Sequence, residues 1–204
     1  MAAEQTEEVV SMKQNMSTQR LAFLGMMTAL VFAGNYARII MPVPVGGVPS
    51  FTLANILCVL SGLLLGPVGG LASGLGSALY DLTNPLWAAE CWITFLTKGA
   101  MGLMAGVAVT AGRRGEGVKP ATYGRYLTAA VVGCLSYYVL YYLKDFFYNG
   151  MLIGGLQPQA AAVTLLALIP TSIFNGGVAI IAAPPLALAV REALKRSGLR
   201  LKMA

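Results

Sequence analysis

The sequence contains no histidine and few charged residues, and these two shortages restrict the kind of protein it can be. Only 11% of its 204 residues are charged, whereas soluble domains carry about a quarter. This leaves too little polar surface to coat a globule in water, and 57% of the residues are hydrophobic. The composition therefore predicts an integral membrane protein.

Cysteine is scarce as well. Cys58, Cys91 and Cys134 are scattered, and no two of them form a CxxC pair. Since histidine is absent too, neither a structural zinc site nor a Cys/His nucleophile is expected. The glycine-rich stretch 66–70 has no basic residue nearby and is no ATP site. We predict no metal, no cofactor and no catalytic residue.

The net charge of +6 does not indicate nucleic-acid binding, because the basic residues gather in three short segments between apolar stretches. The first predicted span, 21–40, is longer than the apolar part of a signal peptide and is interpreted as a retained helix. It follows a polar arm at 1–19. After it, the proline-rich segment 41–49 cannot be regular helix.

The stretch 51–82 allows two interpretations. One helix would be about 48 Å long, well beyond the hydrocarbon thickness of about 30 Å. Gly66-Pro67 near its middle would instead allow a hairpin of two short helices. Length alone leaves the choice open.

Charge distribution decides in favour of the hairpin. Further spans are predicted at 93–111, 126–148 and 160–190. With six spans and a cytoplasmic N-terminus, 11 of the 14 Lys and Arg residues lie in the cytoplasm, as the positive-inside rule requires. We therefore predict an all-α, six-helix membrane domain at 20–190 with a basic cytoplasmic tail at 191–204.

The external connections are then 41–50, 83–92 and 149–159. Six charged residues lie at the outer ends of the predicted helices: Arg38, Asp81, Glu90, Lys98, Lys144 and Asp145. They could pair with one another and hold the helix ends together, or they could line a polar cup that opens outward. We favour the cup, because Asn55, Tyr80, Asn84, Asn149 and Asn175 supply neutral polar groups nearby.

Small residues recur at every fourth position in two places. Gly25, Ala29 and Ala33 form a smooth ridge on the first span, where another helix could approach closely. Because this span is otherwise apolar, we interpret the ridge as a contact with another protein. The second series, Gly62 to Ala78, is interpreted as internal packing.

Several segments together resemble the substrate-binding subunits (S components) of energy-coupling-factor (ECF) transporters. The ridge of the first span resembles that family's small-residue motif. Phe51-Thr-Leu-Ala-Asn-Ile, Leu79-Tyr-Asp-Leu-Thr-Asn-Pro, Phe95-Leu-Thr-Lys-Gly and Ile169-Pro-Thr-Ser-Ile-Phe-Asn resemble later helices of its vitamin-binding branch. The resemblance covers about 20–190.

The resemblance implies a subunit of the bacterial cell membrane that captures a vitamin from outside. Its expected partners are a membrane coupling subunit, contacted by Gly25, Ala29 and Ala33, and two cytoplasmic ATPases. The expected substrate-binding residues are Arg38, Asn55, Tyr80, Asp81, Asn84, Lys98, Tyr141, Lys144, Asp145, Asn149 and Asn175.

The identity of the vitamin stays open at this point. The clustered tryptophan and acidic residues of a thiamin binder are not evident, and a cobalt or nickel binder would need histidine. Riboflavin, pyridoxine-type vitamins and pantothenate all remain. A proton-coupled permease and an integral membrane enzyme using Asp81, Glu90 or Asp145 are the alternatives.

Overall fold

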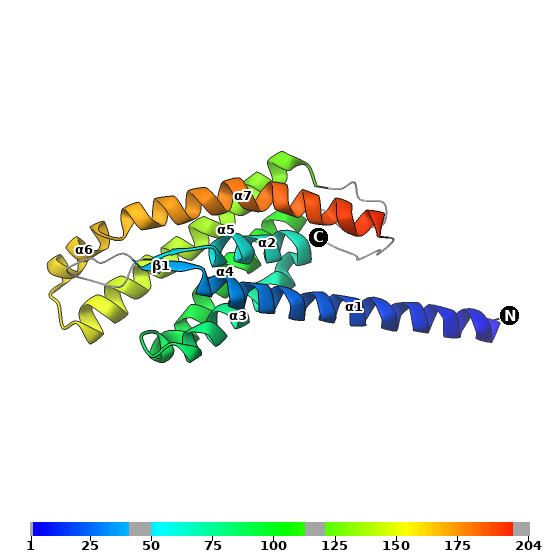
Figure 1. Cartoon of the computed structure of the whole chain (residues 1–204), viewed down its shortest axis with the longest axis horizontal. Coiled ribbons are helices and arrows are strands. Elements are labelled where there is room, and N and C mark those ends of the chain that lie inside the picture. The colour runs from blue at the N-terminus through cyan, green and yellow to red at the C-terminus, as the bar shows by residue number, and fades with distance from the viewer. Residues whose placement is uncertain (1, 41–49, 113–120, 198–204) are drawn as a thin grey trace.

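Long helices that run side by side make up the structure (Figure 1). The computed structural model describes residues 2–40, 50–112 and 121–197, with side chains from residue 18 onward. The first helix begins, and the last helix ends, at the same end of the bundle. The strand β1 and the short helix α6 lie at the opposite end.

The first helix, α1 (Ala2–Tyr36), ends earlier than the predicted span. Three residues of that span instead form strand β1 (Arg38–Ile40), which pairs antiparallel with β2 (Ser50–Thr52). This small hairpin was not predicted, because three residues are too few to show a strand periodicity. The proline-rich segment 41–49 lies outside the described residues.

The stretch 51–82 forms the expected hairpin. Its elements are α2 (Ala54–Leu65), the 3₁₀ turn η1 (Gly66–Val68) and α3 (Gly69–Thr83). Buried polar contacts join the two arms: Ser61 Oγ lies 2.6 Å from Ser73 Oγ, and Cys58 Sγ lies 3.8 Å from Ser77 Oγ. The pairing of earlier with later residues shows that the arms are antiparallel. Gly66 has a φ of 68°, which favours glycine.

Glycines let the hairpin pack closely on α4 (Cys91–Thr110), which follows the 3₁₀ turn η2 (Ala88–Glu90). A Cβ at Gly62 would lie 2.2 Å from the carbonyl oxygen of Gly102, and one at Gly106 would lie 2.2 Å from that of Gly66. Only residues without side chains allow this approach. The interpretation of the second small-residue series as internal packing is confirmed at Gly62, Gly70 and Gly74.

The last two predicted spans differ in detail from the structure. Helix α5 (Tyr123–Lys144) continues without a break into a π-helical segment, η3 (Asp145–Ile153). The stretch predicted at 160–190 forms two helices, α6 (Pro158–Leu166) and α7 (Ile169–Arg196). Pro170 lies in the first turn of α7, where its missing N–H is tolerated.

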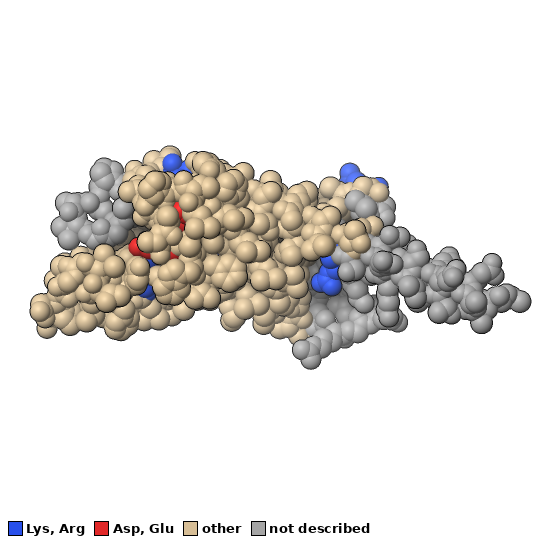
Figure 2. All heavy atoms as spheres, turned by 90° about the horizontal axis from the view of Figure 1, so that it is seen from below, with Lys and Arg blue, Asp and Glu red and all other residues tan. Residues whose placement is uncertain are grey.

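Within the described residues, four stretches are long and apolar enough to cross a membrane: Ala54–Thr83, Ala88–Thr110, Tyr123–Ile153 and Ile169–Arg196. The first is the hairpin, so it supplies two arms, and α1 completes the six helices. Figure 2 shows charged side chains toward both ends of the visible face and an uncharged band between them. This is the surface expected of a protein that spans a bilayer.

The expected arm at 1–19 is helical in the backbone and continuous with the rest of α1, without a break at residue 20. Helix α7 likewise continues to Arg196, into the expected tail. The described part of the chain does not include residues 113–120, which are most of the predicted cytoplasmic loop, or residues 198–204. The division into arm, membrane domain and tail therefore stays a prediction.

Candidate functional site

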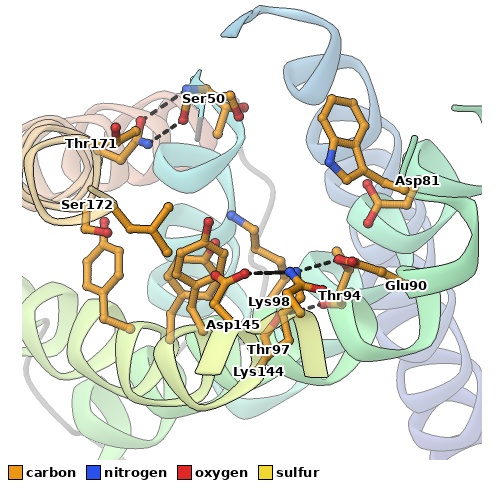
Figure 3. A pocket seen from close by; sticks show the side chains of 18 of the residues that line it. Ser50, Asp81, Glu90, Thr94, Thr97, Lys98, Lys144, Asp145, Thr171 and Ser172 are labelled. Atoms are coloured by element: carbon orange, nitrogen blue, oxygen red, sulfur yellow. Dashed lines mark hydrogen bonds and ion pairs between the residues drawn. The ribbon is translucent and has the colours of Figure 1, made fainter. Parts of the chain in front are cut away.

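A cavity of about 470 Å³ lies at the end of the bundle that carries β1, β2 and α6 (Figure 3). Its walls come from the β1–β2 hairpin, the first turn of α2, the end of α3, α4, α5, η3 and α7. Pockets for small molecules typically occupy about 300–1,000 Å³. Described residues of all three predicted external connections thus line one chamber of the right size for a small ligand.

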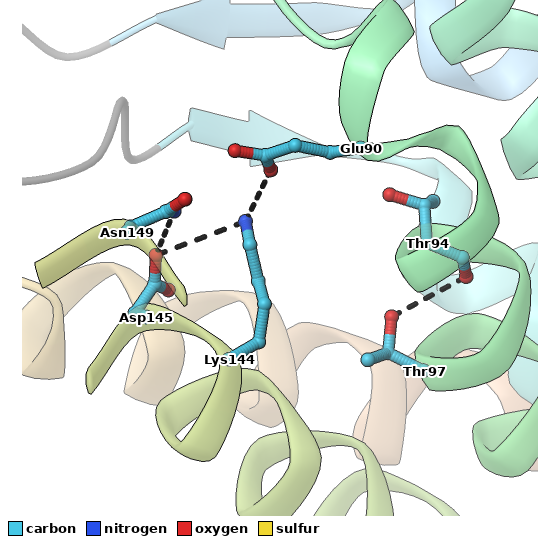
Figure 4. A network of polar contacts seen from close by, with 6 residues as sticks. All are labelled: Glu90, Thr94, Thr97, Lys144, Asp145 and Asn149. Atoms are coloured by element: carbon cyan, nitrogen blue, oxygen red, sulfur yellow. Dashed lines mark hydrogen bonds and ion pairs between the residues drawn. The ribbon is translucent and has the colours of Figure 1, made fainter. Parts of the chain in front are cut away.

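All six charged residues predicted at the outer helix ends line this cavity. Lys144, at the end of α5, lies between two carboxylates, with its Nζ 2.5 Å from Glu90 Oε2 and 3.8 Å from Asp145 Oδ1 (Figure 4). Asn149 Nδ2 donates to the same Asp145 oxygen at 2.6 Å. The other oxygen, Oδ2, is fully buried. Lys144 thus joins Glu90 of the η2 turn to Asp145 at the start of η3.

The π-helical geometry of η3 places these groups. Asp145 and Asn149 are four residues apart and contact each other, and both line the cavity. Next to Asn149, a Cβ at Gly150 would lie 2.9 Å from the Cβ of Ala161 in α6. π-Helical segments occur often at functional sites. Here the segment is held against α6 and carries polar side chains on the cavity.

Lys98 lies in the part of the cavity formed by α2 and α4. Only 5% of Lys98 is exposed, and its Nζ donates a hydrogen bond to Asn55 Oδ1. The ammonium also lies 4.2 Å from the centre of the Tyr137 ring. Among the residues that the structure describes, no carboxylate forms an ion pair with it. The buried ammonium of Lys98 is therefore stabilised by a hydrogen bond to an amide and by a cation–π contact with an aromatic ring.

Arg38 is held in a similar way at the rim. Its guanidinium lies 4.4 Å from the Trp87 ring and 4.9 Å from the Tyr80 ring, and it donates to Asn35 Oδ1 at 2.9 Å. Asn35 belongs to α1 and Trp87 to the connection after α3. Arg38 therefore joins the strand, the first helix and this connection.

Asn175 connects α7 to β2. Its Nδ2 donates to the Ser50 carbonyl at 2.7 Å, and its Oδ1 accepts from the Thr52 amide at 3.1 Å. The rings of Phe51 and Phe174 pack edge to face at 4.5 Å beside these bonds. One side chain thus anchors the strand that forms one edge of the cavity.

Aromatic side chains of α5 supply a flat wall. The Tyr137 and Tyr141 rings are nearly parallel, with their centres 5.5 Å apart and an angle of 24° between them. Tyr138 lines the cavity beside them. Such a wall can stack on a planar aromatic ligand.

Of the eleven residues predicted to bind substrate, the structure places nine around the cavity. Tyr80 and Asn84 do not line it. Tyr80 is buried beneath Arg38 and against Tyr36. Asn84 ends α3, and its Oδ1 accepts a hydrogen bond from the Leu86 amide. For the nine others, substrate contact stays a prediction.

Several lining residues were not predicted: Glu90, Trp87, Thr94, Thr97, Tyr137, Thr171 and Ser172. Glu90 was recognised as an outer-end charge but was not named as a site residue. Nothing in the sequence marks Thr94 and Thr97 as site residues except that they lie within about one helical turn of Lys98. No group of three or more Asp, Glu, Cys or His residues able to hold a metal occurs among the described residues.

The small-residue ridge of α1 faces away from the bundle. Gly25, Ala29 and Ala33 are exposed, and a Cβ at Gly25 would meet nothing within 4 Å. Gly25 and Ala29 also line a shallow apolar hollow with Phe32 and Leu79. Since these three residues are exposed in the described chain, the ridge is open to a partner.

Comparison with known proteins identifies the fold and the family. A structure of the S component of a bacterial ECF transporter superposes with a TM-score of 0.57 over 88% of this chain and 99% of that chain. The sequence identity is 16%, so this likeness shows the fold alone. No curated protein matches in a sequence search. The family model for the S component of the ECF-type riboflavin transporter matches residues 15–192. The chain therefore belongs to the family of ECF-type riboflavin transporter S components.

Proposed function

We propose that this chain captures riboflavin in the outer cavity and that its N- and C-termini are cytoplasmic. The protein is the substrate-binding membrane subunit of an ECF-type importer, which works with a membrane coupling subunit and ATPase subunits. Riboflavin is the substrate named for the family. We propose no catalytic role, because capture requires binding groups alone.

The cavity provides the contacts that riboflavin would require. The vitamin has a planar tricyclic ring, with carbonyl groups and one N–H on its polar edge, and a chain of hydroxyl groups. The Tyr137–Tyr141 wall could stack on the ring. Asn55 could donate to a carbonyl group of the ring. This combination of an aromatic wall with polar side chains that line the same cavity is the observation that carries the proposal.

The positions of the carboxylates also support binding over proton-coupled transport. A proton-coupled permease would use carboxylates near the middle of the membrane. Asp81, Glu90 and Asp145 all line the outer cavity instead. Energy for uptake then comes from the ATPase subunits.

A vitamin panel on the purified protein tests the proposal. Protein stripped of ligand in detergent is mixed with riboflavin, whose fluorescence is expected to fall on binding as the ring stacks on tyrosine. Excess thiamin, pyridoxine or pantothenate should not displace it. If another of these vitamins binds and riboflavin does not, the proposal is wrong.

A further inference from the structure

We infer that Lys98 is a positioning residue that orients the Asn55 amide, so that Asn55 presents its N–H groups to an acceptor on the substrate. The inference rests on the proposed function, because the acceptor belongs to riboflavin. It assigns different roles to two neighbouring side chains. Asn55 contacts the substrate, and Lys98 acts through Asn55.

The contact between the two side chains allows one orientation of the amide. A lysine ammonium has three donors and no acceptor. Because Lys98 Nζ donates to Asn55, the carbonyl oxygen Oδ1 must face Lys98 and the nitrogen Nδ2 must face away. A flipped amide would bring two donors together and lose the bond. The cation therefore fixes the direction in which Asn55 can donate.

The nitrogen of Asn55 is free to bind a ligand. Nδ2 makes no hydrogen bond to any residue in the described ranges, and it does not belong to the sealed, unpaired polar atoms of the structure. Asn55 is only 2% exposed and lines the cavity. A substrate acceptor that enters the cavity can therefore pair with this nitrogen.

The packing of the helices keeps the two side chains in register. Helix α2 approaches α4 closely at Gly62 with Gly102, and the η1 turn that follows α2 does so at Gly66 with Gly106. Asn55 lies about two turns before Gly62, and Lys98 lies about one turn before Gly102. The glycine contacts thus set the separation at which the lysine reaches the amide.

The Tyr137 ring holds the ammonium from another side. Its centre lies 4.2 Å from Lys98 Nζ, and the ring is largely buried. Among the described residues, no carboxylate forms an ion pair with Lys98. The ring and the Asn55 amide are therefore the groups that hold the ammonium.

A double-mutant cycle tests the inference through the riboflavin dissociation constant. Asn55→Ala and Lys98→Met should each weaken binding about tenfold, the value of one hydrogen bond. The double variant should be no weaker than either single variant, because Lys98 acts through Asn55. If the two effects multiply to about a hundredfold, Lys98 contributes independently and the inference is overturned.

Two further variants separate orientation from stability. Lys98→Gln can still donate to Asn55 and should recover part of the affinity that Lys98→Met loses. Asn55→Asp keeps the contact with Lys98 but presents an acceptor in place of the donor, so it should bind more weakly than Asn55→Ala. Equal affinities of the Gln and Met variants, or of the Asp and Ala variants, would contradict the orienting role.

Riboflavin analogues with one ring nitrogen replaced by CH give a readout that folding does not affect. The wild-type protein should discriminate against 1-deaza- or 5-deazariboflavin, and both Asn55→Ala and Lys98→Met should lose that discrimination together. Wild-type protein that fails to bind riboflavin would overturn the proposed function and this inference with it. Wild-type binding with full discrimination kept in Lys98→Met would overturn the inference alone.

Discussion

Lys144 lies between two carboxylates of the cavity, those of Glu90 and Asp145. Replacing it with methionine would leave two neighbouring carboxylates without their cation. Breaking a buried pair in this way costs about 3 kcal/mol. We expect Lys144→Met to lower the melting temperature of the protein in detergent.

Lys195→Met is the matched control, since Lys195 is exposed on α7. It should leave the melting temperature unchanged. Adding Glu90→Gln to Lys144→Met should restore part of the loss, because it removes one of the two unbalanced charges. A Lys144→Met protein as stable as the Lys195→Met control would contradict the role given to this pair.

Charge was the informative signal at the residue scale. In an apolar chain, an ionisable residue near a helix end is costly and rare, so Arg38, Asp81 and Lys98 could be placed at one site from sequence alone. Thr94 and Thr97 could not, since threonine occurs throughout membrane helices with its hydroxyl bonded to its own backbone. Thr97 does bond to the Thr94 carbonyl.

At the scale of elements, Asn175 holds β2 against α7 by two hydrogen bonds. Each bond contributes about 1 kcal/mol. We expect Asn175→Ala to loosen this edge of the cavity and to speed riboflavin dissociation about tenfold or more, measured by stopped-flow fluorescence. Ser172→Ala, nearly one turn earlier on the same helix, is the control. Equal dissociation rates for the two variants would show that β2 does not retain the ligand.

The contact between α2 and α4 depends on glycine. Gly62→Ala should destabilise the protein by about 1–3 kcal/mol, because its Cβ would lie 2.2 Å from the Gly102 carbonyl oxygen. Gly25→Ala is the matched control, since no atom lies within 4 Å of that position. Thermal unfolding of both variants in detergent checks this. If Gly62→Ala unfolds at the wild-type temperature, the close packing is not required.

The elements themselves were largely predictable. Charge distribution favoured the α2–α3 hairpin over a single helix, a choice that length alone left open. The boundaries of α4 agree closely with the predicted span 93–111. The π-helical segment η3 was not predictable, because its apolar sequence fits an ordinary helix equally well. The division between α6 and α7 was not predicted either, because the sequence is apolar on both sides of it. Pro170 is the one residue nearby that favours the start of a new helix.

At the scale of the whole molecule, we propose different roles for two surfaces: substrate binding for the cavity and partner contact for the ridge of α1. Replacing both Ala29 and Ala33 with leucine should abolish uptake by the assembled importer while leaving riboflavin affinity unchanged. Both positions are exposed, so the bulkier side chains would meet only a partner. Uptake in cells and binding by purified protein are measured in parallel. Loss of both activities would mean that the ridge is needed for folding.

The most direct test of the account is riboflavin titration of the purified wild-type protein beside a variant with an obstructed cavity. Thr97→Trp would place a large ring in the cavity that Thr97 lines. We expect tight, one-to-one binding to the wild type and at least a hundredfold loss in Thr97→Trp, with similar melting temperatures in the absence of ligand. Equal binding by the two proteins, or none by the wild type, would contradict the capture of riboflavin in the outer cavity.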